Sequence, residues 1–240
     1  MTVKSGVMGC AALCGYLIAG QALGDCTPVL MSGKDDVSVC KDWPAYPGLT
    51  INVEARFEPG GAKALDTYDL DLSVSMNAQP YQIATYHQPA AIVLDGVALR
   101  ELTLDTARYK LTSDVRAFGV RASLSNGSRL IPLEENQLSL YVKEGEKLRP
   151  VLHKLVVYRY GGEWDGNCVG ERYETSRTVE LAKTSSYGYA DLIVKTHETS
   201  TSSVGEGDAC ENKTTTYKPV LTTLRYDGES YVLPKGFKGD

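Results

Sequence analysis

Residues 68–74 read Tyr-Asp-Leu-Asp-Leu-Ser-Val, so apolar and polar side chains alternate along this stretch. A period of two places every second side chain on the same face of an extended chain, which is typical of a half-buried β-strand. The same period recurs at 138–142 and at 191–194, and Val157 is followed by tyrosines at 158 and 160. We therefore predict an all-β fold of antiparallel, hairpin-rich sheets, either sandwich-like or propeller-blade-like.

Turn sequences separate the alternating stretches, at 58–61, 95–96, 126–127, 144–146, 161–162 and 227–228. Asn-Gly and Asp-Gly are strong hairpin signals, because type I′ turns need residues that accept positive φ. Residues 89–104 carry enough apolar side chains for a helix, but Asp95-Gly96 in their middle favours two strands and a turn. The polar stretch 199–208 is predicted to be a surface loop.

The first 24 residues have the features of a secretory signal peptide. Lys4 is the sole charged residue before Asp25, and residues 6–20 are apolar or small. Ala22 and Gly24 provide the small-x-small pattern that a signal peptidase recognises. We predict cleavage after Gly24 and a periplasmic or secreted protein, which contacts the membrane only through the signal before cleavage.

Two alternatives to a cleaved signal remain open. An uncleaved anchor would need about 20 apolar residues, more than this segment contains. A lipoprotein could be acylated at Cys10 or Cys26, but Asp25 precedes Cys26 and no hydrophobic segment precedes Cys10.

Four cysteines remain after removal of the signal: Cys26, Cys40, Cys168 and Cys210. An even number in an exported chain indicates two disulfides. We expect Cys26–Cys40 and Cys168–Cys210, since each pair closes one loop, although the number of cysteines alone also permits other pairings. Zinc is the alternative, but no two of these cysteines have metal-ligand spacing and no histidine is near them.

The length of 240 residues allows one large domain or two smaller ones. We predict an N-terminal β-rich half at 25–125 and a C-terminal β-rich half at 126–240, with one continuous domain as the alternative.

The chain has 25 basic and 30 acidic residues and a formal charge of −5. This balance provides no basic footprint, so we expect no nucleic-acid partner.

The sequence contains no recognisable catalytic motif. A Gly-x-Ser-x-Gly segment is missing, and the three histidines, His87, His153 and His197, are isolated from one another. We therefore predict a protein that is not an enzyme and that uses no cofactor and no metal ion.

Carboxylate pairs support the enzymatic alternative, a cell-wall or carbohydrate-active hydrolase. Glu163 and Asp165 flank a tryptophan that could stack on a sugar ring, and Asp69 and Asp71 share one face of a strand. Asp66 would add a third oxygen ligand for calcium beside this second pair, but the complete calcium-loop motif is missing.

Aromatic and arginine residues gather around residues 161–162. The candidate binding surface consists of Tyr158, Arg159, Tyr160, Trp164, Arg172 and Tyr173. Tyrosine, tryptophan and arginine are enriched at interface hot spots. We predict an exported, soluble binding protein for a protein or cell-envelope ligand, similar to an inhibitor or an immunity protein. A structural envelope component, in which the tyrosines only stabilise the sheet, is the alternative.

Segments of the second half resemble uncharacterised exported β-rich bacterial envelope proteins. The resemblance rests on residues 138–141, 162–168, 188–194 and 224–231. The last two segments are also similar to the sequence pattern of FG-GAP-like propeller repeats. Those repeats carry an acidic calcium loop where Ser185-Ser186-Tyr187 stands here. The resemblance therefore implies an envelope β-protein and no particular activity.

Overall fold

The alternating segments of the sequence form the strands of an all-β structure with two disulfides, as predicted. The computed structural model describes residues 26–77, 79–206 and 209–239, so the predicted signal peptide at 1–24 lies outside the described residues. The described residues form β1 (Val37–Asp42), β2 (Leu49–Glu58), the 3-10 helix η1 (Gly61–Lys63), β3 (Asp66–Met76), β4 (Gln79–Leu94), β5 (Ala98–Lys110), β6 (Arg116–Ser125), β7 (Leu133–Glu144), β8 (Lys147–Trp164), β9 (Gly170–Ser186), β10 (Tyr189–Val204), β11 (Glu211–Thr216) and β12 (Val220–Leu224).

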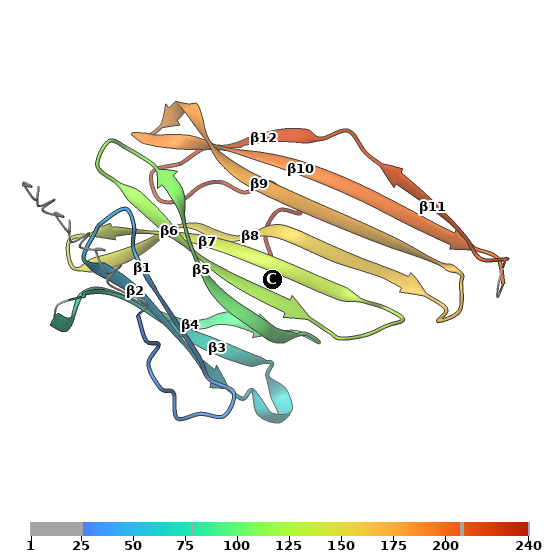
Figure 1. Ribbon diagram of the computed structural model, residues 1–240, viewed down its shortest axis with the longest axis horizontal. Helices are drawn as coiled ribbons and strands as arrows, with labels where there is room; N and C mark the ends of the chain where they lie inside the picture. Colours follow the sequence, from blue (N-terminus) through green and yellow to red (C-terminus); the bar gives the residue numbers. More distant parts are fainter. Residues whose placement is uncertain (1–25, 78, 207–208, 240) are drawn as a thin grey trace, which may run out of the picture.

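The strands pair in the order β1-β2-β3-β4-β8-β7-β6-β5, β9 pairs with β8 and β10, and β11 and β12 both pair with β10. Figure 1 shows three groups, β1–β4, β5–β8 and β9–β12. Within the described residues the pairs are antiparallel except for the contact of β4 with β8, which is parallel at Thr85 and Lys147. Lys41 Nζ of β1 donates to Leu104 O of β5 at 3.2 Å, so the two ends of this strand order meet.

The first hydrophobic core lies between the β1–β4 group and one face of β5 and β6. Leu70, Leu72 and Val74 of β3 point into it, which confirms the alternation in the sequence. Trp43 is almost fully buried and packs edge-on against Phe118, with ring centroids 5.1 Å apart. Apolar burial on this scale is the main stabilising contribution to the fold.

A second core lies on the other side of the β5–β8 group, against β10 and β12. Leu140 and Val142 of β7 belong to this second core, whereas Tyr141 between them belongs to the first. Because successive side chains point to opposite faces, β7 separates two cores. The molecule is therefore layered, with the β5–β8 group in the middle.

The C-terminal segment fills the edge of β8 between β4 and β9. Tyr231 N donates to Val151 O at 2.7 Å, and Val156 N donates to Phe237 O at 2.8 Å. From Tyr158 onward β9 takes over as the partner on this edge. These bonds satisfy backbone groups of β8 that would otherwise be left unpaired in the interior.

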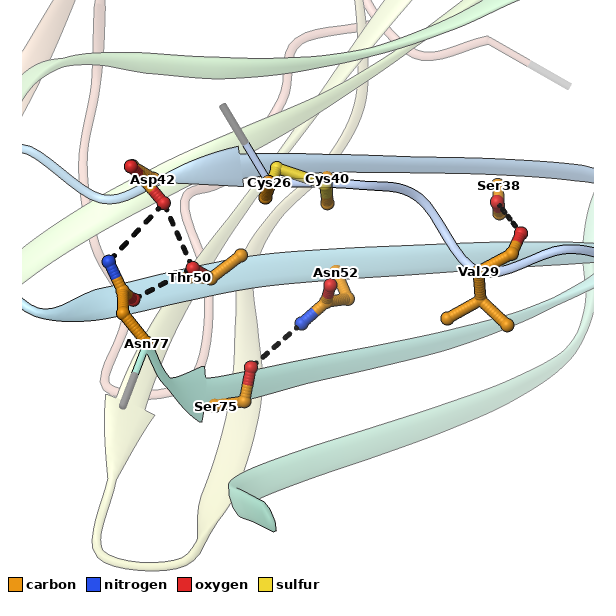
Figure 2. The surroundings of a disulfide bond; sticks show 9 residues. All are labelled: Cys26, Val29, Ser38, Cys40, Asp42, Thr50, Asn52, Ser75 and Asn77. Atoms are coloured by element: carbon orange, nitrogen blue, oxygen red, sulfur yellow. Dashed lines mark hydrogen bonds between the residues drawn. A yellow bond between two sulfur atoms is a disulfide. The ribbon is translucent and has the colours of Figure 1, made fainter. Parts of the chain in front are cut away.

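Both predicted disulfides are present, Cys26–Cys40 and Cys168–Cys210. The first ties the segment before β1 to β1 itself, and Figure 2 shows it beside a polar cluster around Thr50. The Thr50 hydroxyl lies 2.9 Å from Asp42 Oδ1 and 2.8 Å from Asn77 Oδ1. The disulfide and these contacts hold β1 and β2 at the edge of the sheet.

Residues 89–104 form two strands joined by a turn, as predicted. β4 ends at Leu94, β5 begins at Ala98, and Gly96 between them has a φ of 68°. A left-handed conformation of this kind is open to glycine at little steric cost, which explains why glycine occupies this position in the turn.

Two sequence predictions about turns and loops are wrong. Gly161-Gly162 lies inside β8, because β9 approaches closely: a Cβ on Gly161 would lie 2.5 Å from the Tyr173 hydroxyl. Glycine within a strand marks such close approach. The polar stretch from 199 is the end of β10 up to Val204, since it pairs with β9 on one edge and with β11 on the other.

Candidate functional site

The six residues of the predicted binding surface lie on β8 and β9 but not on one face. These strands pair antiparallel, with Tyr158 opposite Ser176 and Gly162 opposite Arg172. Since side chains alternate along each strand, the set divides in two. One face carries Tyr158, Tyr160, Trp164 and Arg172, and we call it the Trp164 face; Arg159 and Tyr173 lie on the opposite face.

Trp164 and Arg172 contact each other on the Trp164 face. The guanidinium carbon of Arg172 lies 5.3 Å from the centroid of the Trp164 ring, in the range of a cation–π contact. Arg172 Nη2 also donates to Ser203 Oγ at 3.1 Å, and Ser203 donates to Asn212. Side chains from β10 and β11 therefore hold the arginine in place beneath the aromatic ring.

Tyr158 and Tyr160 continue this face along β8. Both side chains are half-buried, so each retains an accessible edge. Burial raises the pKa of Tyr158, and the carboxylates of Glu174 and Glu134 raise it further. The Tyr158 hydroxyl therefore stays protonated near neutral pH and can donate a hydrogen bond to a ligand.

A groove of about 580 Å³ extends from Tyr158 across β7 and β6 to β5. It is lined by hydroxyl, amide and arginine side chains, including Arg100, Arg121, Ser123, Asn136, Tyr158 and Ser176. Asn136 Nδ2 donates to Ser123 Oγ at 2.7 Å, which orients both side chains. The volume is within the range of ligand sites, and the polar groups along it can orient a polar ligand.

The two remaining residues of the predicted surface have other roles. Arg159 Nε donates to Glu135 Oε2 at 2.7 Å, and Nη2 contacts the same oxygen, so this arginine is held in an ion pair. The Tyr173 ring covers Gly161 and remains 47% exposed. Neither side chain faces the groove side of β8.

The acidic residues around Trp164 are placed by the hairpin of β8 and β9. Glu163 lies directly opposite Glu171 in the register. Asp165 Oδ1 accepts hydrogen bonds from the backbone of Asn167 at 2.8 Å and of Cys168 at 2.9 Å. Asp165 thus closes the turn that leads into the Cys168–Cys210 disulfide.

The other acidic candidates also make local bonds. Asp69 Oδ1 accepts from Ala90 N at 2.7 Å, and Asp66 Oδ1 accepts from Gly60 N at 2.9 Å. Asp71 contacts Arg56 and lies 2.9 Å from His87 Nδ1. These contacts join β2, β3 and β4 at their outer surface.

The sequence alone did not identify the groove residues on β6, β7 and β9 as site residues. Ser123, Asn136 and Ser176 are ordinary polar residues of alternating strands. They line one groove because β6, β7, β8 and β9 pair in chain order with a register that places these residues in one row across the sheet, through Tyr158. Arg121 and Ser123 alternate with the buried Val120 and Ala122 along β6. This alternation predicts that Arg121 and Ser123 share one face of the strand, but it does not predict which residues of other strands lie beside them.

Comparison with known proteins gives no match to a family model, to a curated protein or to a solved structure. In the part of the chain that the structure describes, no helix is long and apolar enough to cross a membrane. Across residues 26–77, 79–206 and 209–239, no three His, Cys, Asp or Glu side chains are grouped so that they could hold a metal ion.

Proposed function

We propose that this chain is an exported, non-enzymatic binding protein whose protein or cell-envelope ligand lies on the Trp164 face and in the adjoining groove. The observation that carries the proposal is the continuity of this surface. Four residues of hot-spot type share one face of β8 and β9, and that face leads directly into a groove lined by polar side chains.

Preorganisation of the surface supports a binding role. Arg172 is already held by Trp164 and Ser203, and Asn136 is already bonded to Ser123. Side chains that are ordered before binding lose less conformational entropy when a ligand arrives. A partner of mixed charge suits the face, because it carries arginines and the carboxylates of Glu134 and Glu174.

The two disulfides support export to the periplasm or the cell exterior. Disulfides persist in oxidising compartments and are rare where thiols are kept reduced. The predicted signal peptide would direct the chain there. An inhibitor-like or immunity-like function fits this location.

The test is affinity capture from a periplasmic and envelope extract with purified protein as bait. We expect the wild type to enrich a partner that Trp164→Ala recovers at least about tenfold less, as expected for a hot-spot residue. Ser176→Trp, at an exposed position lining the groove, should have the same effect without removing a buried contact.

Tyr173→Ala is the matched control, because Tyr173 is an exposed tyrosine on the opposite face of the same strand pair. It should retain the partner. The proposal fails if the wild type enriches nothing beyond Trp164→Ala, or if Tyr173→Ala loses the partner equally while all variants keep the circular dichroism spectrum of the wild type.

A further inference from the structure

A cavity of about 430 Å³ lies between the β3–β4 pair and the β6–β7 pair, on the other side of the β5–β8 group from the second core. Its inner wall is apolar and contains small side chains, with Leu70, Ala91, Ile92, Val120 and Ala122. Leu70 and Ala122 belong to the first core yet keep 5% and 7% of their surface accessible. The cavity therefore borders the first core and has the volume of a small-molecule site.

The lining of the same cavity also includes basic side chains, beside the neutral polar residues Gln88, Gln137 and Ser139. His153 and Lys154 come from β8, and Lys238 comes from the C-terminal segment. The nearby carboxylate of Glu135 on β7 is held by Arg159 and by Gln137. The lining thus combines cationic, neutral polar and hydrocarbon groups.

The backbone is strained where these basic residues are held. Lys154 has a φ of 48°, a left-handed conformation that is uncommon for residues other than glycine. Its N–H donates to Ser139 Oγ at 3.0 Å, and its carbonyl accepts from Gly239 N at 2.8 Å. Strain of this kind persists when the surrounding structure imposes it, and it is concentrated at functional sites.

The two lysines beside His153 affect its protonation. Burial lowers the pKa of His153, and the charges of Lys238 and Lys154 lower it further. The imidazole is therefore neutral near neutral pH and can donate one hydrogen bond, beside two ammonium groups.

We propose that this cavity binds a small organic anion with an apolar body, such as a carboxylate on a short hydrocarbon chain. The carboxylate would lie between Lys238 and His153, and the hydrocarbon would lie against Ala91 and Ala122. A charge-assisted hydrogen bond from Lys238, whose side chain is exposed, and apolar burial against the two alanines then act on one molecule. This site is separate from the Trp164 face, so its ligand is independent of the partner proposed above.

Isothermal titration of the purified protein with octanoate near neutral pH tests the proposal, with octanol as the uncharged probe. We expect saturable binding of octanoate and binding of octanol that is about tenfold weaker or more, since charge-assisted hydrogen bonds are lost. Lys238→Gln should weaken octanoate binding by a similar factor. Lys235→Gln, an exposed lysine of the same segment outside the cavity lining, should leave it unchanged.

Filling the cavity gives a second measurement. Ala122→Leu and Ala91→Leu place hydrocarbon where the ligand body would lie, so each should abolish octanoate binding with the fold retained by circular dichroism. The proposal is overturned if the wild type shows no saturable octanoate binding, if octanol binds as tightly as octanoate, or if Lys238→Gln and Lys235→Gln behave alike. Folded leucine variants that still bind as the wild type does would also overturn it.

Discussion

Asp105 is a carboxylate whose side chain is only 14% exposed and is hydrogen-bonded by three neighbours. Arg121 Nη2 donates at 2.6 Å, the Tyr109 hydroxyl at 2.9 Å and Ala107 N at 2.9 Å. Burial acts to raise the pKa of Asp105, but these hydrogen bonds and the charge of Arg121 together hold it below its usual value. The ionised form is therefore the one that stabilises the folded protein.

Asp105→Asn should lower the free energy of unfolding by about 2 kcal/mol near neutral pH, because a charge-assisted pair is lost. Since the folded pKa lies below the unfolded value of about 3.9, the contribution is complete above that pH. It disappears as the pH falls through the folded pKa. Urea denaturation at several pH values measures the difference between the two proteins.

The exposed Asp95→Asn serves as the control, and its stability should follow that of the wild type at every pH. A constant difference between the wild type and Asp105→Asn down to strongly acidic pH would contradict the assigned role of Asp105.

At the scale of elements, β9, β10 and β11 run out toward one end of the molecule, with β11 at the edge (Figure 1). β11 is exposed along its whole length, so little apolar burial holds it. The Cys168–Cys210 disulfide ties its start to the loop after β8 across a sequence separation of 42. This covalent link takes the place of packing at that end.

Replacing Cys168 and Cys210 by alanine should destabilise the protein by up to about 4 kcal/mol, the chain-entropy value for a loop of this size. The loss should be concentrated at the exposed end, so limited proteolysis should cleave near β11 before the rest unfolds. Mass spectrometry of the fragments identifies the cleavage sites.

The double variant Cys26→Ala/Cys40→Ala is the comparison, because it opens the shorter loop beside β1. It should leave β11 as resistant to protease as in the wild type. Equal cleavage near β11 in both double variants would show that the Cys168–Cys210 bond does not hold this end in place.

At the scale of the whole molecule, the C-terminal segment joins the β5–β8 group to the β9–β12 group. Phe237 packs against the second core, and the Arg177 guanidinium lies 4.4 Å from the centroid of its ring. Phe237 O also accepts from Val156 N of β8. One residue thus contacts β8 and β9 where these two strands diverge.

Phe237→Ala should lower the free energy of unfolding by about 2 kcal/mol, less than for a fully buried phenylalanine because the side chain is only partly buried. Thermal and urea denaturation measure the change. Val232→Ala, at a side chain that is 56% exposed in the same segment, should cost far less. Similar losses in the two variants would contradict a stabilising role for the Phe237 contacts.

Several features of the fold follow from local sequence. The alternation at 68–74 and at 138–142 predicted β3 and β7, because a period of two in side-chain direction is a property of the extended chain itself. Asp95-Gly96 predicted the turn between β4 and β5, since positive φ is a local requirement. The cysteine pairs followed from loop closure along the chain.

The candidate site was only partly predictable. Residue types and alternation identified Trp164 and Arg172, but not that Arg159 is held by Glu135 on the other face. The Gly161-Gly162 pair was wrongly predicted to be a turn, because the close approach of β9 cannot be seen in the sequence. The Tyr173 ring lies against Gly161, and the Glu171 carbonyl lies against Gly162. A single sequence shows which residues an extended strand can present, not which strand lies beside it.

By itself, the sequence determined the all-β class and the positions of many strands and turns, and it favoured the two cysteine pairs that the structure contains. The strands and turns depend on φ and ψ preferences and on side-chain alternation, which are properties of neighbouring residues. Only the tertiary structure decided that β7 separates two cores, that a groove joins Tyr158 to Ser123, and that Lys238 and His153 line one cavity. Those arrangements depend on contacts between residues far apart in the chain, which strand pairing and packing establish together.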